Sequence, residues 1–368
     1  MPETHVRAAT RRRQTGEATP LEVTLELTHR CNLHCVHCFL DGSRQADDLD
    51  TEQVKSVLDQ LADAGTVAVA FTGGEALLRR DFLAVAEHAQ RRGLFHSVQT
   101  NGTLLGKETV RGLAATNPVK VEVSLYGATP AVHDFTTTTP GSFERSVRAI
   151  GMLAGEGIRT VVNTTVMTHN CHQVRSMQAL AECLGAHYSP DPMLAPAFGG
   201  SGGGLRYRCD SGQLRGFILD RGWRKACDST RAAPSSTDRL ICSAGVSKCA
   251  ISPVGEVYPC VLWRQGAGSL RQAPFSKIWA GRAFAERRST SVSDLRVCPD
   301  CRLRGVCVRC PGFAYLEDGD PFGPSSEACR VTGVFREVID DGRGDKEEEV
   351  RAAARGVGTG AAAVGSSV

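Results

Sequence analysis

The eight-residue stretch Cys31-Asn-Leu-His-Cys35-Val-His-Cys38 constrains this chain more than any other segment. Its three thiols are spaced CxxxCxxC directly after an apolar run at 21–27. A loop this short can fold three thiolates around one metal centre. A four-iron cluster held by three cysteines keeps one iron open, and open metal positions are where chemistry occurs. The alternative is a zinc site in which His34 or His37 supplies a fourth ligand.

Composition excludes several functional classes. The chain has 368 residues, 41% hydrophobic and 23% charged, which is ample for a soluble core with an accessory domain. A net charge of +3 does not indicate nucleic-acid binding. No apolar run could span a membrane, and residues 1–20 lack the apolar core of a signal peptide. We therefore expect a cytoplasmic protein with no nucleic-acid or membrane partner, in which a content of 15 cysteines indicates metal binding rather than structural disulfides.

The first half of the chain alternates between two apolar patterns, one typical of strands and one typical of helices. This alternation favours an α/β fold with a parallel sheet and helices outside it. Five or six units indicate a partial (β/α)6 TIM-like barrel, although periodicity leaves open whether the sheet is curved. The expected strands are 21–27, 67–71, 96–100, 119–125, 158–167 and 187–193, and the expected helices are 51–64, 81–92, 107–115, 143–155 and 171–184.

Three further loops follow strands in the same way as the cysteine loop. They are Gly73-Gly74-Glu75, the Gln-Thr-Asn-Gly segment 99–102 and the Ser-Leu-Tyr-Gly segment 124–127. Each is ordinary turn chemistry by itself. Because the carboxyl ends of parallel strands form the active face of α/β folds, we expect all four loops to converge there.

Together and in this order, the four loops resemble the core of the radical S-adenosylmethionine (radical SAM) enzymes. By this resemblance, Cys31, Cys35 and Cys38 are the catalytic residues that hold a 4Fe–4S cluster. The open iron binds SAM, and reduction releases a 5′-deoxyadenosyl radical that takes hydrogen from the substrate. The resemblance also assigns SAM-binding roles to His37, Gly73, Gly74, Glu75, Asn101 and Ser124.

These SAM contacts differ in kind. The backbone of Gly73-Gly74 and the carboxylate of Glu75 would receive the ammonium group of SAM, Ser124 its ribose or carboxylate, and His37 its adenine. Members of the family often carry an arginine after a His-Asp pair. This chain has Thr136 to Thr139 at that place, which leaves the carboxylate contact unassigned.

A second group of cysteines lies in the last third of the chain. Spacing alone slightly favours zinc. The order, with Gly255 five residues before Cys260, resembles the SPASM domain, which carries two auxiliary 4Fe–4S clusters. One departure is a gap of two residues before Cys310, where three is common. The resemblance assigns Cys242, Cys249, Cys260 and Cys310 to the first auxiliary cluster and Cys298, Cys301, Cys307 and Cys329 to the second.

The domain organisation follows from these patterns. We expect a flexible tail at 1–20, the radical SAM core at 21–195, a linker or insertion at 196–240 and the SPASM domain at 241–335. Residues 342–368, charged and then rich in Ala, Gly and Ser, are expected to be disordered. The remaining cysteines, whose spacing matches no ligand motif, are read as ordinary thiols: Cys171, Cys183, Cys209 and Cys227.

The segments 124–134 and 140–143 resemble maturases of ribosomally made peptides (RiPPs). The expected function is therefore hydrogen abstraction from a peptide to form a thioether or carbon–carbon crosslink. The expected partners are the peptide, a separate leader-recognition protein, since few residues precede the first strand, and an electron donor such as flavodoxin or ferredoxin. Val261 stands where anaerobic sulfatase maturases carry an aspartate base, which counts against that activity here. The alternatives are a radical dehydrogenase or epimerase of a small metabolite such as an aminosugar, and a non-enzymatic metal-stabilised binding protein.

Overall fold

The computed structural model describes residues 18–40, 47–198, 202–220 and 240–356, with only the backbone course for 342–356. Most of the expected N-terminal tail therefore lies outside the described residues. None of the described helices is both long and apolar enough to cross a bilayer.

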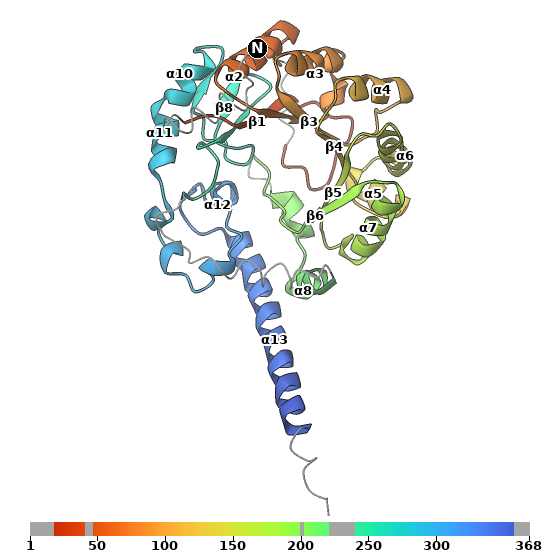
Figure 1. The fold of residues 1–368 in the computed structure, drawn as a ribbon, viewed down its shortest axis with the longest axis vertical. Helices are drawn as coiled ribbons and strands as arrows, with labels where there is room; N and C mark the ends of the chain where they lie inside the picture. Colours follow the sequence, from red (N-terminus) through yellow and green to blue (C-terminus); the bar gives the residue numbers. More distant parts are fainter. Residues whose placement is uncertain (1–17, 41–46, 199–201, 221–239, 357–368) are drawn as a thin grey trace, which may run out of the picture.

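Six parallel strands form the core in the order β6-β5-β4-β3-β2-β1. The sheet curves in an arc, with the connecting helices along its outer side (Figure 1). This confirms the α/β class and settles the curvature that periodicity left open. The strands are β1 Glu22–Thr28, β2 Ala68–Gly73, β3 Phe95–Thr100, β4 Lys120–Ser124, β5 Thr160–Thr165 and β6 His187–Asp191; the helices are α2 Thr51–Asp63, α3 Phe82–Arg91, α4 Lys107–Ala115, α6 Ser142–Gly155 and α7 Val174–Cys183.

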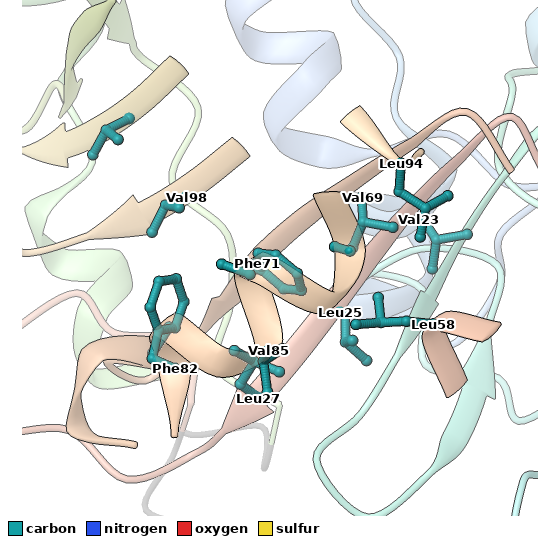
Figure 2. Packing of buried hydrophobic residues seen from close by; sticks show 14 of the residues in the cluster. Val23, Leu25, Leu27, Leu58, Val69, Phe71, Phe82, Val85, Leu94 and Val98 are labelled. Atoms are coloured by element: carbon teal, nitrogen blue, oxygen red, sulfur yellow. The ribbon is translucent and has the colours of Figure 1, made fainter. Parts of the chain in front are cut away.

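The strands separate apolar from polar side chains by their two-residue period. Val23, Leu25 and Leu27 of β1 are buried together with Leu58 of α2 and other apolar residues of the sheet's outer side (Figure 2). Strand positions of the other parity carry polar groups that bond across neighbouring strands. Thr72 Oγ1 donates to Gln99 Oε1 at 2.9 Å, and Gln99 Nε2 donates to Glu122 Oε2 at 3.1 Å. The helix-facing side of the sheet is therefore apolar and the other side polar.

The cysteine-rich region continues the same sheet. Strand β7 (Lys248–Ile251) pairs in parallel with β1, and β8 (Glu256–Tyr258) and β9 (Gly268–Ser269) follow antiparallel. Helices α10 (Phe275–Ala280), α11 (Arg282–Ser289) and α12 (Pro311–Asp318) complete the region. The expected second domain is thus joined to the core by a backbone ladder.

Two segments differ from the sequence-based expectation. Helix α5 (Pro130–Thr137) was not predicted, because its eight residues carry no long apolar stripe. Helix α13 (Ser326–Gly356) continues through residues 342–356, which corrects the expected disorder there. The reason is that these residues follow a packed helix and are rich in the helix formers Glu, Lys, Arg and Ala. Residues 357–368 lie outside the described part.

The described part of the expected linker contains helical structure. It holds a 3-10 helix, η3 (Gly202–Tyr207), and helix α8 (Ser211–Asp220). Leu214 and Phe217 of α8 are buried in one apolar cluster with Val331 and Phe335 of α13. The linker therefore anchors the C-terminal helix.

Candidate active site

A cavity of about 330 Å³ lies where the strand ends meet the cysteine loop. The loops after β1, β2, β3 and β4 all reach it, as the sequence predicted, and so does the end of β6. Its lining residues include Cys31, Cys35, His37, Cys38, Gly73, Gly74, Asn101, Ser124, Tyr126, Asp191, Met193, Leu194, Leu262 and Phe313.

The end of helix α5 fixes the cysteine loop. The backbone nitrogens of His34 and Val36 donate to the carbonyls of Thr137 and Thr136 at 3.3 and 2.9 Å. Thr138 Oγ1 donates to the carbonyl of His34 at 3.0 Å. The threonine run found in place of the family's arginine therefore holds the loop that carries the thiols.

The three thiols of this loop lie close enough to influence one another. Burial, and then the charges of Cys38 and Cys31, raise the pKa of Cys35 to about 12. Crowded thiolates of this kind are costly without a cation, and iron supplies the compensating charge when it replaces the protons. The donor set of Cys31, Cys35 and Cys38 therefore fits an iron–sulfur cluster.

Gly73 and Gly74 let two loop backbones run against each other. Gly73 has a φ of +139°, and a Cβ there would lie 2.1 Å from the carbonyl oxygen of Thr28. A Cβ on Gly74 would lie 2.4 Å from the carbonyl oxygen of Arg30. Gly74 N also donates to Thr28 O at 2.7 Å. Only glycine fits at these positions, which both line the cavity.

Glu75 is placed differently from the expectation. Its carboxylate is fully buried and accepts hydrogen bonds from Leu77 N, Thr100 Oγ1 and Asn101 N at 3.1, 2.8 and 2.7 Å. It is absent from the cavity lining. The carboxylate thus braces the loops after β2 and β3, and Gly73 and Gly74 are the members of this motif that line the cavity.

Asn101 joins the β3 loop to the cysteine loop. Its Nδ2 donates to Asn32 Oδ1 at 3.0 Å and lies 3.9 Å from Cys31 Sγ. The amide also orders its own loop, because its Oδ1 accepts from Thr103 Oγ1 at 2.6 Å. Asn101 therefore lines the cavity and contacts the Cys31 thiol.

His37 and Tyr126 form an aromatic corner of the cavity. Their ring centroids are 4.6 Å apart at an interplanar angle of 75°. Burial, and then the charge of His169, lower the pKa of His37 to about 4, so its ring is neutral at pH 7. Its buried Nδ1 has no hydrogen-bond partner among the described residues. A neutral ring with a free polar edge fits an adenine contact. Tyr126 shares a side-chain hydrogen bond with Ser124.

The sequence-based prediction missed Tyr126 and Asp191 as cavity residues. Tyr126 stood inside the recognised Ser-Leu-Tyr-Gly loop, and Asp191 ends β6, so a polar residue at a strand end was the available signal. Asp191 is the one carboxylate among the described lining residues. Burial raises its pKa, while the hydrogen bond from Met193 N to Oδ1, at 2.8 Å, lowers it; the net shift is upward.

The cysteine-rich region supplies part of the cavity wall and two groups of thiols. Leu262 and Phe313 line the cavity beside the core residues. In one group, Cys310 and Cys242 act electrostatically on Cys260. In the other, Cys329 is influenced by three neighbours, Cys307, Cys298 and Cys301.

Seven of the eight cysteines assigned to auxiliary clusters are therefore gathered in the two expected sets. Cys249 is the exception. It lies on β7, is 2% exposed, and belongs to the apolar core.

Two protein-family models match this chain. A radical SAM superfamily model matches residues 25–179, and the SPASM iron–sulfur cluster-binding domain model matches residues 242–302. The chain is 34% identical over 322 residues to the mycofactocin maturase MftC of Mycobacterium tuberculosis, covering 82% of this chain and 81% of that protein. It is 27% identical over 337 residues to an AdoMet-dependent heme synthase of Nitratidesulfovibrio vulgaris, covering 83% and 91%.

The solved structure of Streptococcus suis SuiB bound to S-adenosylmethionine has the same fold. Its TM-score is 0.69 at 16% identity, over 87% of this chain and 80% of SuiB. The two matching domains imply SAM and 4Fe–4S clusters, including auxiliary clusters, as cofactors. The thiols and loops described above fit these groups, and the chain belongs to the radical SAM superfamily, with a SPASM iron–sulfur domain behind its core.

Proposed function

We propose that this chain is a ribosomal peptide maturase that cleaves SAM reductively and forms a thioether or carbon–carbon crosslink in its substrate. The observation that carries the proposal is the shared cavity. SAM-facing loops of the core and Leu262 and Phe313 of the SPASM region border one space, so a substrate there lies beside both domains. The relative named as a maturase aligns with 82% of this chain, which supports the same arrangement of a core and a SPASM region around the substrate.

The chain's own residues position the reactants in this proposal. Cys31, Cys35 and Cys38 hold the cluster, while Gly73 and Gly74 offer their backbone to SAM. When bound, SAM and the reduced cluster would supply the agent that removes a hydrogen atom from the substrate, and an auxiliary cluster would provide an electron acceptor. The apolar wall restricts the water that could quench the reacting carbon; its members are Met193, Leu194, Leu262 and Phe313.

Asp191 is proposed as the proton acceptor. Joining an S–H to a C–H removes one hydrogen atom, one proton and one electron. SAM's adenosyl fragment would take the hydrogen atom and a cluster would take the electron, so a base must still accept the proton. Asp191 lies on the cavity, and its raised pKa makes it a stronger base than an aspartate of ordinary pKa.

Heme-type chemistry is the second candidate, because relatives named heme synthases align at 27–29% identity. Heme carries carboxylates, which proteins commonly pair with Arg or Lys. The described lining residues include neither Arg nor Lys. A small-metabolite dehydrogenase or epimerase is the remaining alternative.

The test is a mass measurement on anaerobically reconstituted protein with SAM, a reductant and candidate precursor peptides. Loss of two hydrogens per event, together with 5′-deoxyadenosine, is the expected result. An unchanged mass with deuterium uptake from heavy water would instead mean epimerisation. Deoxyadenosine without peptide change would move the substrate to heme precursors or small metabolites and reject the proposal.

Matched variants separate the active thiols from the others. Replacing Cys31, Cys35 and Cys38 with Ala should abolish deoxyadenosine formation while auxiliary iron remains. Cys183→Ala, at an exposed thiol of α7, should leave both products at wild-type levels.

Reduced flavodoxin or ferredoxin, and a separate leader-recognition protein, are proposed as partners. Adding each one should raise turnover.

A further inference from the structure

The strand register shows where the Cys249 side chain points. Strand β7 pairs in parallel with β1, and Cys249 lies opposite Val23. Directly opposite residues of paired strands point to the same face of a sheet. Val23 is fully buried in the outer core with Leu58 (Figure 2). Cys249 therefore points into the helix-covered core.

The charged group acting on Cys249 is Arg288, not another thiol. The Arg288 guanidinium lies 4.5 Å from the ring centroid of Trp279 and donates to the Trp279 carbonyl at 2.7 Å. This places Arg288 and its thiol neighbour against the aromatic residues of α10 and α11. None of the cysteines grouped with Cys260 acts on Cys249, whereas Cys310 acts electrostatically on both Cys242 and Cys260.

Two arginines border the group of Cys242, Cys260 and Cys310. The Arg287 guanidinium lies 3.5 Å from the ring centroid of Trp263, and Arg309 NH2 donates to the Gly323 carbonyl at 2.7 Å. Both cations act electrostatically on Cys242. Each also has a buried terminal nitrogen, NH1, without a hydrogen-bond partner among the described residues. Buried donors of this kind favour an anionic neighbour.

We propose that the first auxiliary cluster is held by only three thiolates, those of Cys242, Cys260 and Cys310. Cys249 is a core residue, and the fourth iron position accepts an anionic ligand, a thiolate or carboxylate, favoured by Arg287 and Arg309. Cys260 and Cys310 come two and three residues before Leu262 and Phe313, which line the cavity. A substrate anion is therefore one source of the ligand and a solute anion the other.

Iron content tests the ligand set. Cys249→Val keeps the volume and apolarity of the core site, and we expect cluster-replete protein to retain all its iron and sulfide. Cys242→Ala should lose about four irons per chain, one cluster's worth. Loss of the same iron from Cys249→Val, in protein whose circular dichroism is native, would overturn the proposal. Cys227 lies outside the described residues, so Cys227→Ala is combined with Cys249→Val. If only this double variant loses a cluster, Cys227 supplies the fourth ligand and the proposed open position is rejected.

Cyanide, a small anion that binds open iron, tests the fourth position. In holoenzyme saturated with SAM, the open iron of the SAM-binding cluster is blocked. Cyanide should therefore change the electron paramagnetic resonance spectrum of one auxiliary cluster only. Arg287→Gln or Arg309→Gln should raise the half-effect concentration about tenfold, because a facing cation is lost. Arg282→Gln, exposed on the same helix as Arg287, is the control.

An auxiliary spectrum that ignores cyanide would reject the open position. Repeating the titration with peptides bearing a cysteine thiol, and with inorganic phosphate, separates a substrate anion from a solute anion. These readouts use iron and spectra rather than peptide products. The inference can therefore fail while the proposed maturase function stands, and the reverse.

Discussion

Glu75 Oε2 accepts a 2.7 Å hydrogen bond from the backbone nitrogen of Asn101, which ties the loop after β2 to the loop after β3. Glu75→Ala leaves one buried and two partly buried donors without an acceptor, at up to about 1–3 kcal/mol each before relaxation. We expect anaerobic urea titration to show a loss of about 3 kcal/mol or more, with weaker SAM binding. Glu108→Ala, on an exposed position of α4, should change stability by less than about 0.5 kcal/mol. Equal effects of the two variants would contradict the bracing role.

The close approach at Gly73 predicts that a single methyl group disrupts SAM binding. Gly73→Ala sets a Cβ 2.1 Å from the carbonyl oxygen of Thr28 and needs a φ of +139° that alanine rarely adopts. Equilibrium dialysis with labelled SAM should show at least a tenfold loss of affinity. Gly216→Ala, in helix α8 with open space around the site, should bind SAM normally and gain up to about 1 kcal/mol of stability.

Two ion pairs connect β1 with the cysteine-rich region, and their different burial predicts losses of stability of different size. Arg264 NH2 lies 2.6 and 2.7 Å from the two oxygens of Glu26, whose side chain is 2% exposed. Arg264→Ala leaves that buried carboxylate with His29 Nε2, 3.6 Å away, as its remaining ion-pair partner, and should cost up to about 3–5 kcal/mol. The Lys248–Glu22 pair is about half exposed, so Lys248→Ala should cost at most about 1 kcal/mol. Denaturant titration of Arg264→Met with Glu26→Gln should recover most of the loss. No recovery would point to the packing of Arg264 over Phe198 instead.

His96 predicts a loss of stability on mild acidification. Burial lowers its pKa to about 4, and its Nε2 lies 3.0 Å from Thr116 Oγ1. The unfolded chain takes up the proton near pH 6.5, so the neutral ring's contribution is complete above that pH and is lost as the pH falls toward 4. Between pH 7.5 and 5.5 this costs about 1.3 kcal/mol. His96→Gln should flatten the pH dependence by that amount in urea titrations. An unchanged slope would mean that the ring is protonated when folded.

The proposed base predicts a separation of the two products. Asp191→Asn keeps an oxygen that can accept from Met193 N but removes the proton acceptor. We expect 5′-deoxyadenosine to form at near wild-type rates, while crosslinked peptide falls at least tenfold. Asp318→Asn, exposed at the end of α12, should leave both products unchanged. Parallel loss of both products would make Asp191 a binding residue rather than a base.

Local patterns predicted the core elements well, because apolar periodicity is set within each segment. Strand β1 and helix α4 lie within one residue of their expected bounds. Periodicity carries no information on distant pairing, so it could not show that β7 joins β1. The same limit applies to the site. A motif supplies residue types, but only the strand register shows that Cys249 points into the core, and only packing shows that Glu75 turns away from the cavity.

The pairing of β7 with β1 has a consequence for how the protein is made. Strand β1 leads into the first cysteine loop, yet its second neighbour comes from residues 248–251. During synthesis the growing chain therefore presents an unpaired strand edge beside that loop until the later segment arrives, and such edges promote aggregation. A chain truncated after β6 would keep most SAM-facing residues but leave this edge open. The first half of the chain therefore completes its sheet only after the second half has been synthesised.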